Sequence, residues 1–196
     1  MPRSSAVEAQ RTHDAIIDRA VHVASLEGLQ GLTIGRLASD LGMSKAGVIG
    51  RFGSKEDLQL ATLEAAIERW TEYVWRPAEQ APPGLPRLRA IAETWSGFLG
   101  DCPFPGGCFV SAAAFEFDGR EGRVRDAVKD ALDRWHDVLA REARIAIDAG
   151  DLTGDPDQIA FELNAIAVGT NQGAQLRRDP RAGDRCRRAM ERVLTR

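Results

Sequence analysis

Several features are scarce or missing in this sequence of 196 residues. No apolar run approaches the roughly 18 residues that a membrane-spanning helix requires. The start, MPRSSAVEAQRTHD, lacks the apolar core of a signal peptide. Three cysteines, an odd number, fit a reducing compartment better than a disulfide framework. We therefore expect a cytoplasmic protein with no membrane association.

Sequence signatures of catalysis are also missing. There is no P-loop, no Rossmann glycine pattern after a strand, no HExxH and no GxSxG. The three histidines, His13, His22 and His136, are spread along the chain. Cys102 and Cys108 flank a Pro/Gly loop without a neighbouring histidine, so ordinary thiols are expected there. The sequence predicts no enzyme, no cofactor and no metal site.

The charge is distributed unevenly along the chain. The formal net charge is −3, which argues against a general nucleic-acid coat protein. Residues 1–55 nevertheless carry seven Lys and Arg against five Asp and Glu, so the remainder holds the acidic excess. This asymmetry suits a basic DNA-facing part on an acidic body.

Helical periodicity runs through the whole sequence, and no segment alternates as a strand does. The pattern predicts an all-α chain of about nine helices, with an N-terminal arm at residues 1–8. The Pro-rich stretch 77–86 is the clearest boundary. The expected helices span about 6 or 8 to 27, 34–41, 45–52, 55–75, 85–100, 108–116, 121–149, 157–178 and 181–194.

Residues 33–57 carry the most informative local pattern. Thr33, Ser44 and Ser54 are three helix-start signals in close order, because their side chains can accept hydrogen bonds from first-turn N–H groups. Gly42 provides the sharp turn, and Ala38 is small where two helices would cross. An ordinary pair of crossing helices is the alternative. The spacing favours a helix-turn-helix, whose second helix enters the major groove.

The most specific segments are Glu27-Gly28…Gly31-Leu32-Thr33, Leu37-Ala38, Leu41-Gly42-Met43-Ser44-Lys45 and Phe52…Ser54-Lys55-Glu56-Asp57-Leu58. Through them residues 11–63, about a quarter of the chain, resemble the N-terminal domain of the TetR family of transcriptional regulators. The remainder resembles the family only in length and helical character. The resemblance implies a helix-turn-helix DNA-binding domain at 1–55, a connecting helix at about 55–76, and a C-terminal ligand-binding and dimerisation domain at 56–196.

The resemblance also implies which residues contact DNA. Thr33, Ser44 and Lys55 match positions that usually touch the backbone, whereas Ile49 and Arg51 depart from the aromatic residues or histidine common there. Because the glycines of the second motif helix offer no side chain, Arg51 is the strongest polar candidate, for a phosphate or, less favoured, a guanine edge. The full expected set is Thr33, Ser44, Lys45, Ala46, Gly47, Ile49, Gly50, Arg51 and Lys55.

The C-terminal part holds most of the aromatic residues, which in helical domains usually form the core. The resemblance implies that some line an effector cavity and that the last two helices pair with a second copy; the alternative is that both apolar stripes cover the core of one chain. The expected ligand-binding residues are Trp70, Trp95, Phe98, Phe109, Phe115, Trp135, His136, Asn164 and Asn171. The expected dimer residues are Leu163, Ile166, Ala167, Thr170, Gly173, Ala174, Met190 and Val193.

Together these features predict a ligand-responsive regulator that binds double-stranded DNA as a homodimer. The favoured form is a repressor released from a palindromic operator by a small, largely apolar molecule. A constitutive or ligand-enhanced regulator is one alternative. A helical small-molecule-binding protein or enzyme with a vestigial DNA-binding head is another.

Overall fold

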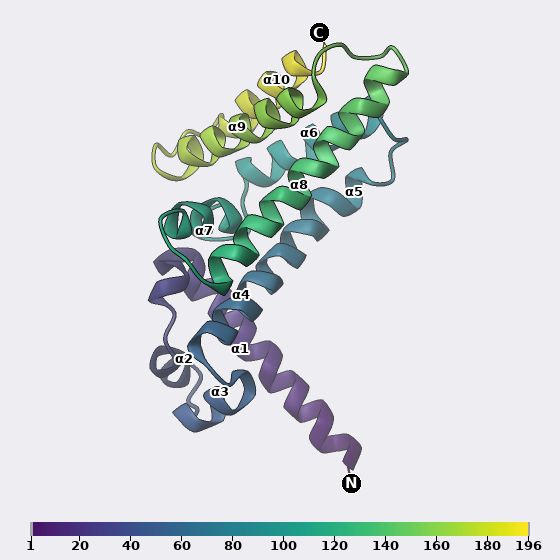
Figure 1. The fold of residues 1–196 in the computed structure, drawn as a ribbon. Helices are drawn as coiled ribbons and strands as arrows, with labels where there is room; N and C mark the ends of the chain where they lie inside the picture. The colour runs from purple at the N-terminus through teal and green to yellow at the C-terminus, as the bar shows by residue number, and fades with distance from the viewer. Residues whose placement is uncertain (1, 196) are drawn as a thin grey trace.

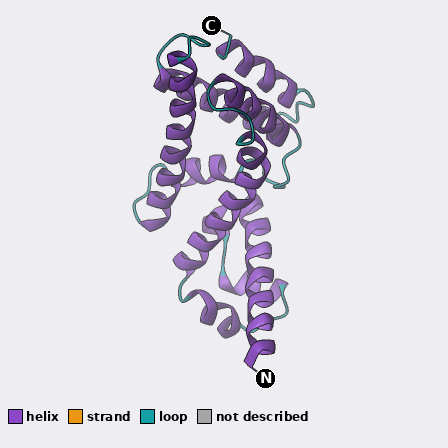
Figure 2. Ribbon diagram, turned by 90° about the vertical axis from the view of Figure 1, so that its right-hand side faces the viewer, coloured by secondary structure: helices purple, strands orange, loops and turns teal. Residues whose placement is uncertain are grey.

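The computed structural model describes the backbone of residues 2–195 and the side chains of residues 7–195. This part of the chain is helical and contains no strand, so the prediction of an all-α fold is confirmed (Figure 2). It holds nine helical units if α4, η1 and α5, which follow one another without a break, count as one. The elements are α1 (Pro2–Gly31), α2 (Ile34–Asp40), α3 (Lys45–Phe52), α4 (Lys55–Trp70), η1 (Thr71–Trp75), α5 (Arg76–Ala78), α6 (Leu85–Gly100), α7 (Phe109–Phe117), α8 (Arg123–Asp148), α9 (Pro156–Gln175) and α10 (Ala182–Val193).

The first helix differs most from its prediction. It begins at Pro2, so the segment 2–8, expected as an arm, is helical, while residue 1 lies outside the described range. Helical geometry is interrupted at Gly28, whose φ of 78° is open to glycine but strained for other residues. The helix was expected to end at Glu27; the structure has a kink at the next residue, and one more turn continues to Gly31.

Three side-chain caps set the boundaries of the next helices. Thr33 Oγ1 accepts from Arg36 N at 3.1 Å, and Ser44 Oγ accepts from Gly47 N at 3.0 Å. Ser54 Oγ accepts from Asp57 N at 3.0 Å and donates to the Asp57 carboxylate at 2.6 Å. Each bond satisfies a first-turn group that the helix itself leaves unpaired. The predicted starts of α2, α3 and α4 are thus confirmed.

Two clusters of buried apolar residues divide the molecule, and α1 contributes to both. A small cluster, the head core, lies among α1, α2, α3 and the start of α4. A larger cluster, the body core, fills the space among α4 and α6–α10. On α1, Ile16, Ala20 and Val23 face the head core, whereas Ile17 and Val21 face the body core. The molecule therefore has a head, consisting of α1–α3, and a body, consisting of α6–α10, with α4 running between them (Figure 1).

The Pro-rich connection before α6 is fixed by a buried carboxylate. Glu142 on α8 is fully buried and accepts from Gly84 N at 2.9 Å, Arg87 at 3.2 Å and Arg141 at 3.0 Å. Burial raises the pKa of Glu142, but the hydrogen bond from Gly84 and the two arginines outweigh it, so the net pKa is below its usual value. This carboxylate ties the loop 79–84 to the middle of the body.

Candidate nucleic-acid interface and internal cavity

The turn and the second motif helix present an exposed, polar surface at the end of the head. Lys45, Ala46, Gly50 and Arg51 are exposed, and so is Ile49, of which 42% is accessible. Val48 alone on α3 is fully buried and anchors the helix in the head core. The α3 N-terminus, where Ser44 forms the cap, therefore combines free backbone N–H groups with exposed side chains, which suits a phosphate.

Three acidic side chains of the head, Asp18, Glu27 and Asp40, pair with arginines. Arg19 and Arg36 both hold Asp40, at 2.6 and 3.0 Å, and the hydrogen bond from Arg19, followed by that from Arg36, lowers the pKa of this carboxyl. Arg36 also reaches Glu27 at 3.4 Å. These pairs remove negative charge that would otherwise repel a polyanion from the head.

The cations around α3 are not neutralised in this way. Arg11, Lys45, Arg51 and Lys55 have no acidic partner among the described residues. Arg51 Nη1 donates to the Ala9 carbonyl at 2.8 Å, which ties the end of α3 to α1 and leaves its charge exposed. Uncompensated charge near helix ends is the electrostatic footprint expected of a phosphate-binding surface.

The segment after the Gly28 kink is held from two sides. Glu116 at the end of α7 accepts from Leu29 N at 2.8 Å and Gln30 N at 2.7 Å. From α4, Lys55 donates to the Gln30 carbonyl at 2.8 Å, and buried Gln59 donates to the Leu29 carbonyl at 2.7 Å. A Cβ at Gly28 would lie 2.8 Å from the Glu116 carboxylate, so a larger residue would displace this carboxylate from its hydrogen bonds in addition to straining φ.

Two further contacts join the head to the body. The loop 101–108 rests on α1, where Gly106 N donates to Ser25 Oγ at 2.8 Å. A Cβ at Gly106 would lie 1.6 Å from the Ser25 carbonyl oxygen, which excludes any side chain at that position. Arg123, at the start of α8, pairs with Glu56 at 3.2 Å and Asp57 at 2.9 Å on α4. The body thus contacts both α1 and the beginning of α4.

All four tryptophans of the chain gather in one cluster inside the body. The ring of Trp135 is the centre: its centroid lies 4.6 Å from Trp70, 5.3 Å from Trp95 and 6.3 Å from Trp75, each in an edge-to-face arrangement. Next to them lies a cavity of about 70 Å³, named here the inner cavity. It is lined by Ile67, Trp70, Trp95, Cys108, Val110, Ser111, Ala131, Leu132, Trp135 and Asn164.

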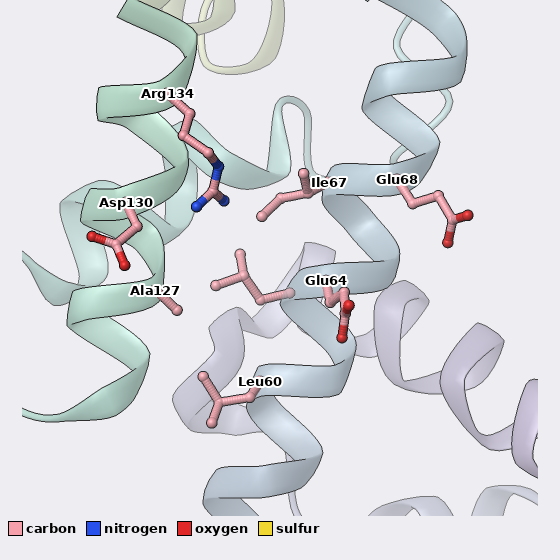
Figure 3. A pocket seen from close by; sticks show the side chains of 8 residues that line it. Leu60, Glu64, Ile67, Glu68, Ala127, Asp130 and Arg134 are labelled. Carbon is pink, nitrogen blue, oxygen red and sulfur yellow. The ribbon is translucent and has the colours of Figure 1, made fainter. Parts of the chain in front are cut away.

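Two more open spaces adjoin the inner cavity. The outer hollow, about 180 Å³, shares Ile67, Trp70, Ala131 and Trp135 with it and is also lined by Trp75. A groove of about 540 Å³ then continues between α4 and α8 to the surface, as Figure 3 shows. Its wall carries Leu60, Leu63, Glu64, Ile67, Glu68, Ala127, Asp130 and Arg134.

The expected ligand-binding residues fall into two groups. Trp70, Trp95, Trp135 and Asn164 line the inner cavity. The other five lie elsewhere: Phe98 and Phe109 are buried in the body core, Phe115 is 68% exposed, His136 lies 3.5 Å from Asp157, and Asn171 Oδ1 accepts from Cys108 N at 2.8 Å. Helical spacing alone did not separate the two groups, because it does not show which buried side chain faces a void and which faces a neighbouring side chain.

Half of the expected dimer residues are buried within this chain, so they cannot form the surface of a dimer interface. Leu163, Ala167, Met190 and Val193 are at most 4% exposed and belong to the core of this chain. The large apolar side chains that α9 does expose are Phe161, at 61%, and Leu176, at 77%. The other four expected residues, Ile166, Thr170, Gly173 and Ala174, are partly exposed on α9. Leu163 and Ala167 are buried because α8 and α10 pack against α9.

Several residues with structural roles at these sites were not singled out from the sequence. They include Cys108, Val110 and Ser111 at the cavity and Glu116 at the kink. For Glu116 a signal existed: it is the single charged residue in the otherwise apolar helix FVSAAAFEF. For the cavity wall nothing in the sequence distinguishes a small residue facing a void from one facing a neighbour.

Two family models match this sequence. One, described as "Tetracyclin repressor-like, C-terminal domain", covers residues 84–190, more than half of the chain. The other, described as "Bacterial regulatory proteins, tetR family", covers residues 16–62 and thus the helix-turn-helix. The chain belongs to the TetR family of transcriptional regulators. TetR-family regulators are generally non-enzymatic DNA-binding proteins.

Several solved structures share this fold, among them a TetR transcriptional regulator. One from Chloroflexus aurantiacus has a TM-score of 0.84 at 22% identity, covering 96% of this chain and 94% of that one. A transcriptional regulator from Saccharomonospora viridis, solved with choline, has a TM-score of 0.72 at 20% identity, with 93% and 95% covered. AibR, solved with isovaleryl coenzyme A and operator DNA, has a TM-score of 0.72 at 19% identity, with 93% and 97% covered. No curated protein sequence matches the chain.

None of the helices within residues 2–195 combines the length and apolar character needed to cross a membrane. The same residues contain no group of three or more His, Cys, Asp and Glu placed to hold a metal ion.

Proposed function

We propose that this TetR-family regulator is a cytoplasmic, non-enzymatic repressor that binds a palindromic operator as a homodimer and leaves it when a small, largely apolar molecule enters the tryptophan-lined cavity. The observation that carries the proposal is the position of helix α7, which contacts both the inner cavity and the segment after the Gly28 kink of α1. Its first turn, with Cys108, Val110 and Ser111, lines the inner cavity. Its last turn holds the Gly28 kink through Glu116.

Through this arrangement, ligand binding in the cavity can change the position of the head. A molecule that enlarges the inner cavity displaces the start of α7, and a helix of this length moves as a rigid unit. The Glu116 carboxylate, held to Leu29 and Gln30 by two hydrogen bonds, would then shift α1. A ligand that binds only the shifted state lowers the DNA affinity by the difference between its affinities for the two states.

On the DNA side, the proposed contacts come from the N-terminus of α3 and its uncompensated cations. Lys45 and Arg51 approach phosphates, with the Ser44-capped N-terminus between α2 and α3 holding another. Thr33 and Lys55 flank the motif, while Ala46, Gly47, Ile49 and Gly50 lie toward the base edges. The alternation of small side chains with one isoleucine favours close helix approach and apolar contact with thymine methyl groups.

The proposed dimer uses the outward face of α9. Phe161, Ala165, Gly169, Gln172 and Leu176 follow at helical spacing and are all exposed, and α9 and α10 lie at the surface of the body far from the head (Figure 1). A two-fold pairing of this face with its copy buries both large apolar side chains. The small residues between them allow close approach of two helices.

The repressor function is tested by selecting bound sequences from a random duplex pool and then measuring affinity on the selected operator across a salt series. Lys45→Ala and Arg51→Ala should each weaken binding to all sequences and lower the slope of log affinity against log salt by about one. Lys129→Ala, a cation on the body, is the control. A selection that yields no enriched sequence, or unchanged binding in both variants, contradicts the proposal.

The dimer is tested separately by light scattering at micromolar concentration. Phe161→Arg and Leu176→Arg should each give monomers, because the interface would then bury an unpaired charge. Arg185→Glu, on the exposed side of α10, is a matched surface control. A wild-type chain that is monomeric under these conditions shows that the α9 face has another role.

A further inference from the structure

Two polar atoms inside the body lack the partner that their burial calls for. The indole Nε1 atoms of Trp95 and Trp135 are buried and make no hydrogen bond to any described residue. Buried donors are bonded in most native structures, and each exception calls for a physical reason. Both tryptophans line the inner cavity, and their rings lie 5.3 Å apart and nearly perpendicular.

The wall of the inner cavity, which both tryptophans line, carries no charge. Besides the tryptophans it consists of aliphatic side chains, the Cys108 thiol, the Ser111 hydroxyl and the Asn164 amide. Burial raises the pKa of the Cys108 thiol, so it stays neutral there. The side chain of Asn164 makes no hydrogen bond to a described residue and is therefore free to orient a ligand.

We propose that the effector of this regulator is an uncharged ring compound with a carbonyl-type acceptor, and that its oxygen is held by the indole N–H groups of Trp95 and Trp135. The inference rests on the proposed function only in taking the inner cavity as the effector site. A ligand oxygen accepts two hydrogen bonds, so one carbonyl suffices for both donors. A hydrocarbon of the same shape leaves both donors unbonded.

An organic cation fits the inner cavity less well, although aromatic rings often hold cations. Cations bind over ring faces, whereas the edge of an indole, with its N–H, is positive. In this cluster the edge-to-face contacts around Trp135 already occupy ring faces. The carboxylates Glu64, Glu68 and Asp130 line the groove and not the inner cavity, and Arg134 lies near Asp130 on α8 (Figure 3).

The size of the spaces sets the size of the ligand. A cavity of about 150 Å³ holds benzene in another protein, so the inner cavity of about 70 Å³ admits only the polar end of a ring compound. The outer hollow of about 180 Å³ shares Ile67, Trp70, Ala131 and Trp135 with the inner cavity. We place the ring of a one-ring or two-ring ligand there, with entry along the groove between α4 and α8.

The test uses three molecules of one shape: indane, 1-indanone and 1-aminoindane, which are apolar, carbonyl-bearing and cationic. Binding to the full-length protein without DNA is measured by calorimetry. We expect 1-indanone to bind about fivefold to tenfold more tightly than indane, as a net hydrogen-bond contribution implies, and 1-aminoindane to bind most weakly.

Phenylalanine variants separate the N–H group from the ring. Trp95→Phe and Trp135→Phe should each bring the ratio of indanone to indane affinity close to one while indane still binds. Trp75→Phe is the matched control, because Trp75 belongs to the same cluster but does not line the inner cavity, and its ratio should stay as in the wild type. Thermal unfolding of each variant shows whether it is folded.

A measurement on the wild-type protein avoids any folding problem. In a ¹⁵N-labelled sample, two of the four indole N–H resonances should move on addition of 1-indanone and stay in place with indane. Equal affinity for all three molecules, tightest binding of 1-aminoindane, no binding of any at millimolar concentration, or unmoved indole resonances would each overturn the inference. If 1-indanone binds as expected but does not release the operator, the inference holds and ligand-released repression is what fails.

Discussion

The head and the body of this regulator satisfy their polar groups in opposite ways. In the head, every helix start after α1 has a side-chain cap and Asp40 is paired with two arginines, while the cations around α3 have no acidic partner among the described residues. In the body, the large core contains two buried indole N–H groups without partners. The helix starts of the head thus have their hydrogen-bond partners and its cations are exposed, whereas the interior of the body contains hydrogen-bond donors without acceptors. The surface proposed to bind a polyanion and the cavity proposed to bind a small molecule therefore differ in how their polar groups are satisfied.

The largest expected effect tests whether the body depends on its one buried carboxylate. Glu142→Ala should lower the free energy of unfolding by about 3 kcal/mol, because Arg87 and Gly84 N lose a buried partner. Chemical denaturation measures the loss. Glu191→Ala, which breaks an exposed pair with Arg89, should cost about 0.5 kcal/mol or less. Equal losses in the two variants would show that the burial of Glu142 is unimportant.

A smaller effect is expected where the two regions meet. Glu116→Ala removes both acceptors from Leu29 N and Gln30 N and should cost about 1–2 kcal/mol. Amide hydrogen exchange at residues 29 and 30 should become faster, and the ligand should release DNA less effectively. Asp118→Ala, just beyond the end of the same helix, is the control. Normal ligand response in Glu116→Ala would break the proposed link between cavity and head.

Loss of a helix cap in the head should lower the free energy of unfolding by about 1 kcal/mol. Ser44→Ala removes the acceptor for Gly47 N at the start of α3. Urea unfolding and operator affinity should both decline, since the same N-terminus is proposed to hold a phosphate. Ser39→Ala, an exposed serine within α2, should leave both unchanged. Lost stability with full DNA affinity would separate the cap from DNA binding.

The smallest effect concerns acid. The pKa of Glu142 is lowered because its hydrogen bond from Gly84 and its two arginines outweigh burial, and the pKa of Asp40 is lowered by hydrogen bonds from Arg19 and Arg36. A lowered folded-state pKa gives stability above the unfolded value, near 4, that is lost as the pH falls through the folded value. Unfolding followed from pH 6 to pH 2 should show this loss. The acid-induced loss of stability should become smaller in Glu142→Gln than in Asp40→Asn, because solvent screens the exposed Asp40 pair. The opposite order would place the acid-sensitive charges in the head.

The sequence by itself determined the parts of this protein that depend on neighbours in the chain. Thr33, Ser44 and Ser54 act within three residues of their own positions, and Gly28 and Gly42 mark backbone conformations of their own, so the head could be predicted closely. The helical class followed from periodicity for the same reason. The start of α1 at Pro2 was not predicted.

Only the tertiary structure decided which face of each body helix turns inward and which residues border a void. Phe98 and Trp95 lie three residues apart on α6 and both belong to the body core, yet only Trp95 lines the cavity. Leu163 is buried and Phe161 exposed on α9 because α8 and α10 approach it from one side. The bond from Glu116 to Leu29 spans 87 positions of the chain. Such contacts depend on how whole helices pack, and periodicity within one helix carries no information about its neighbours.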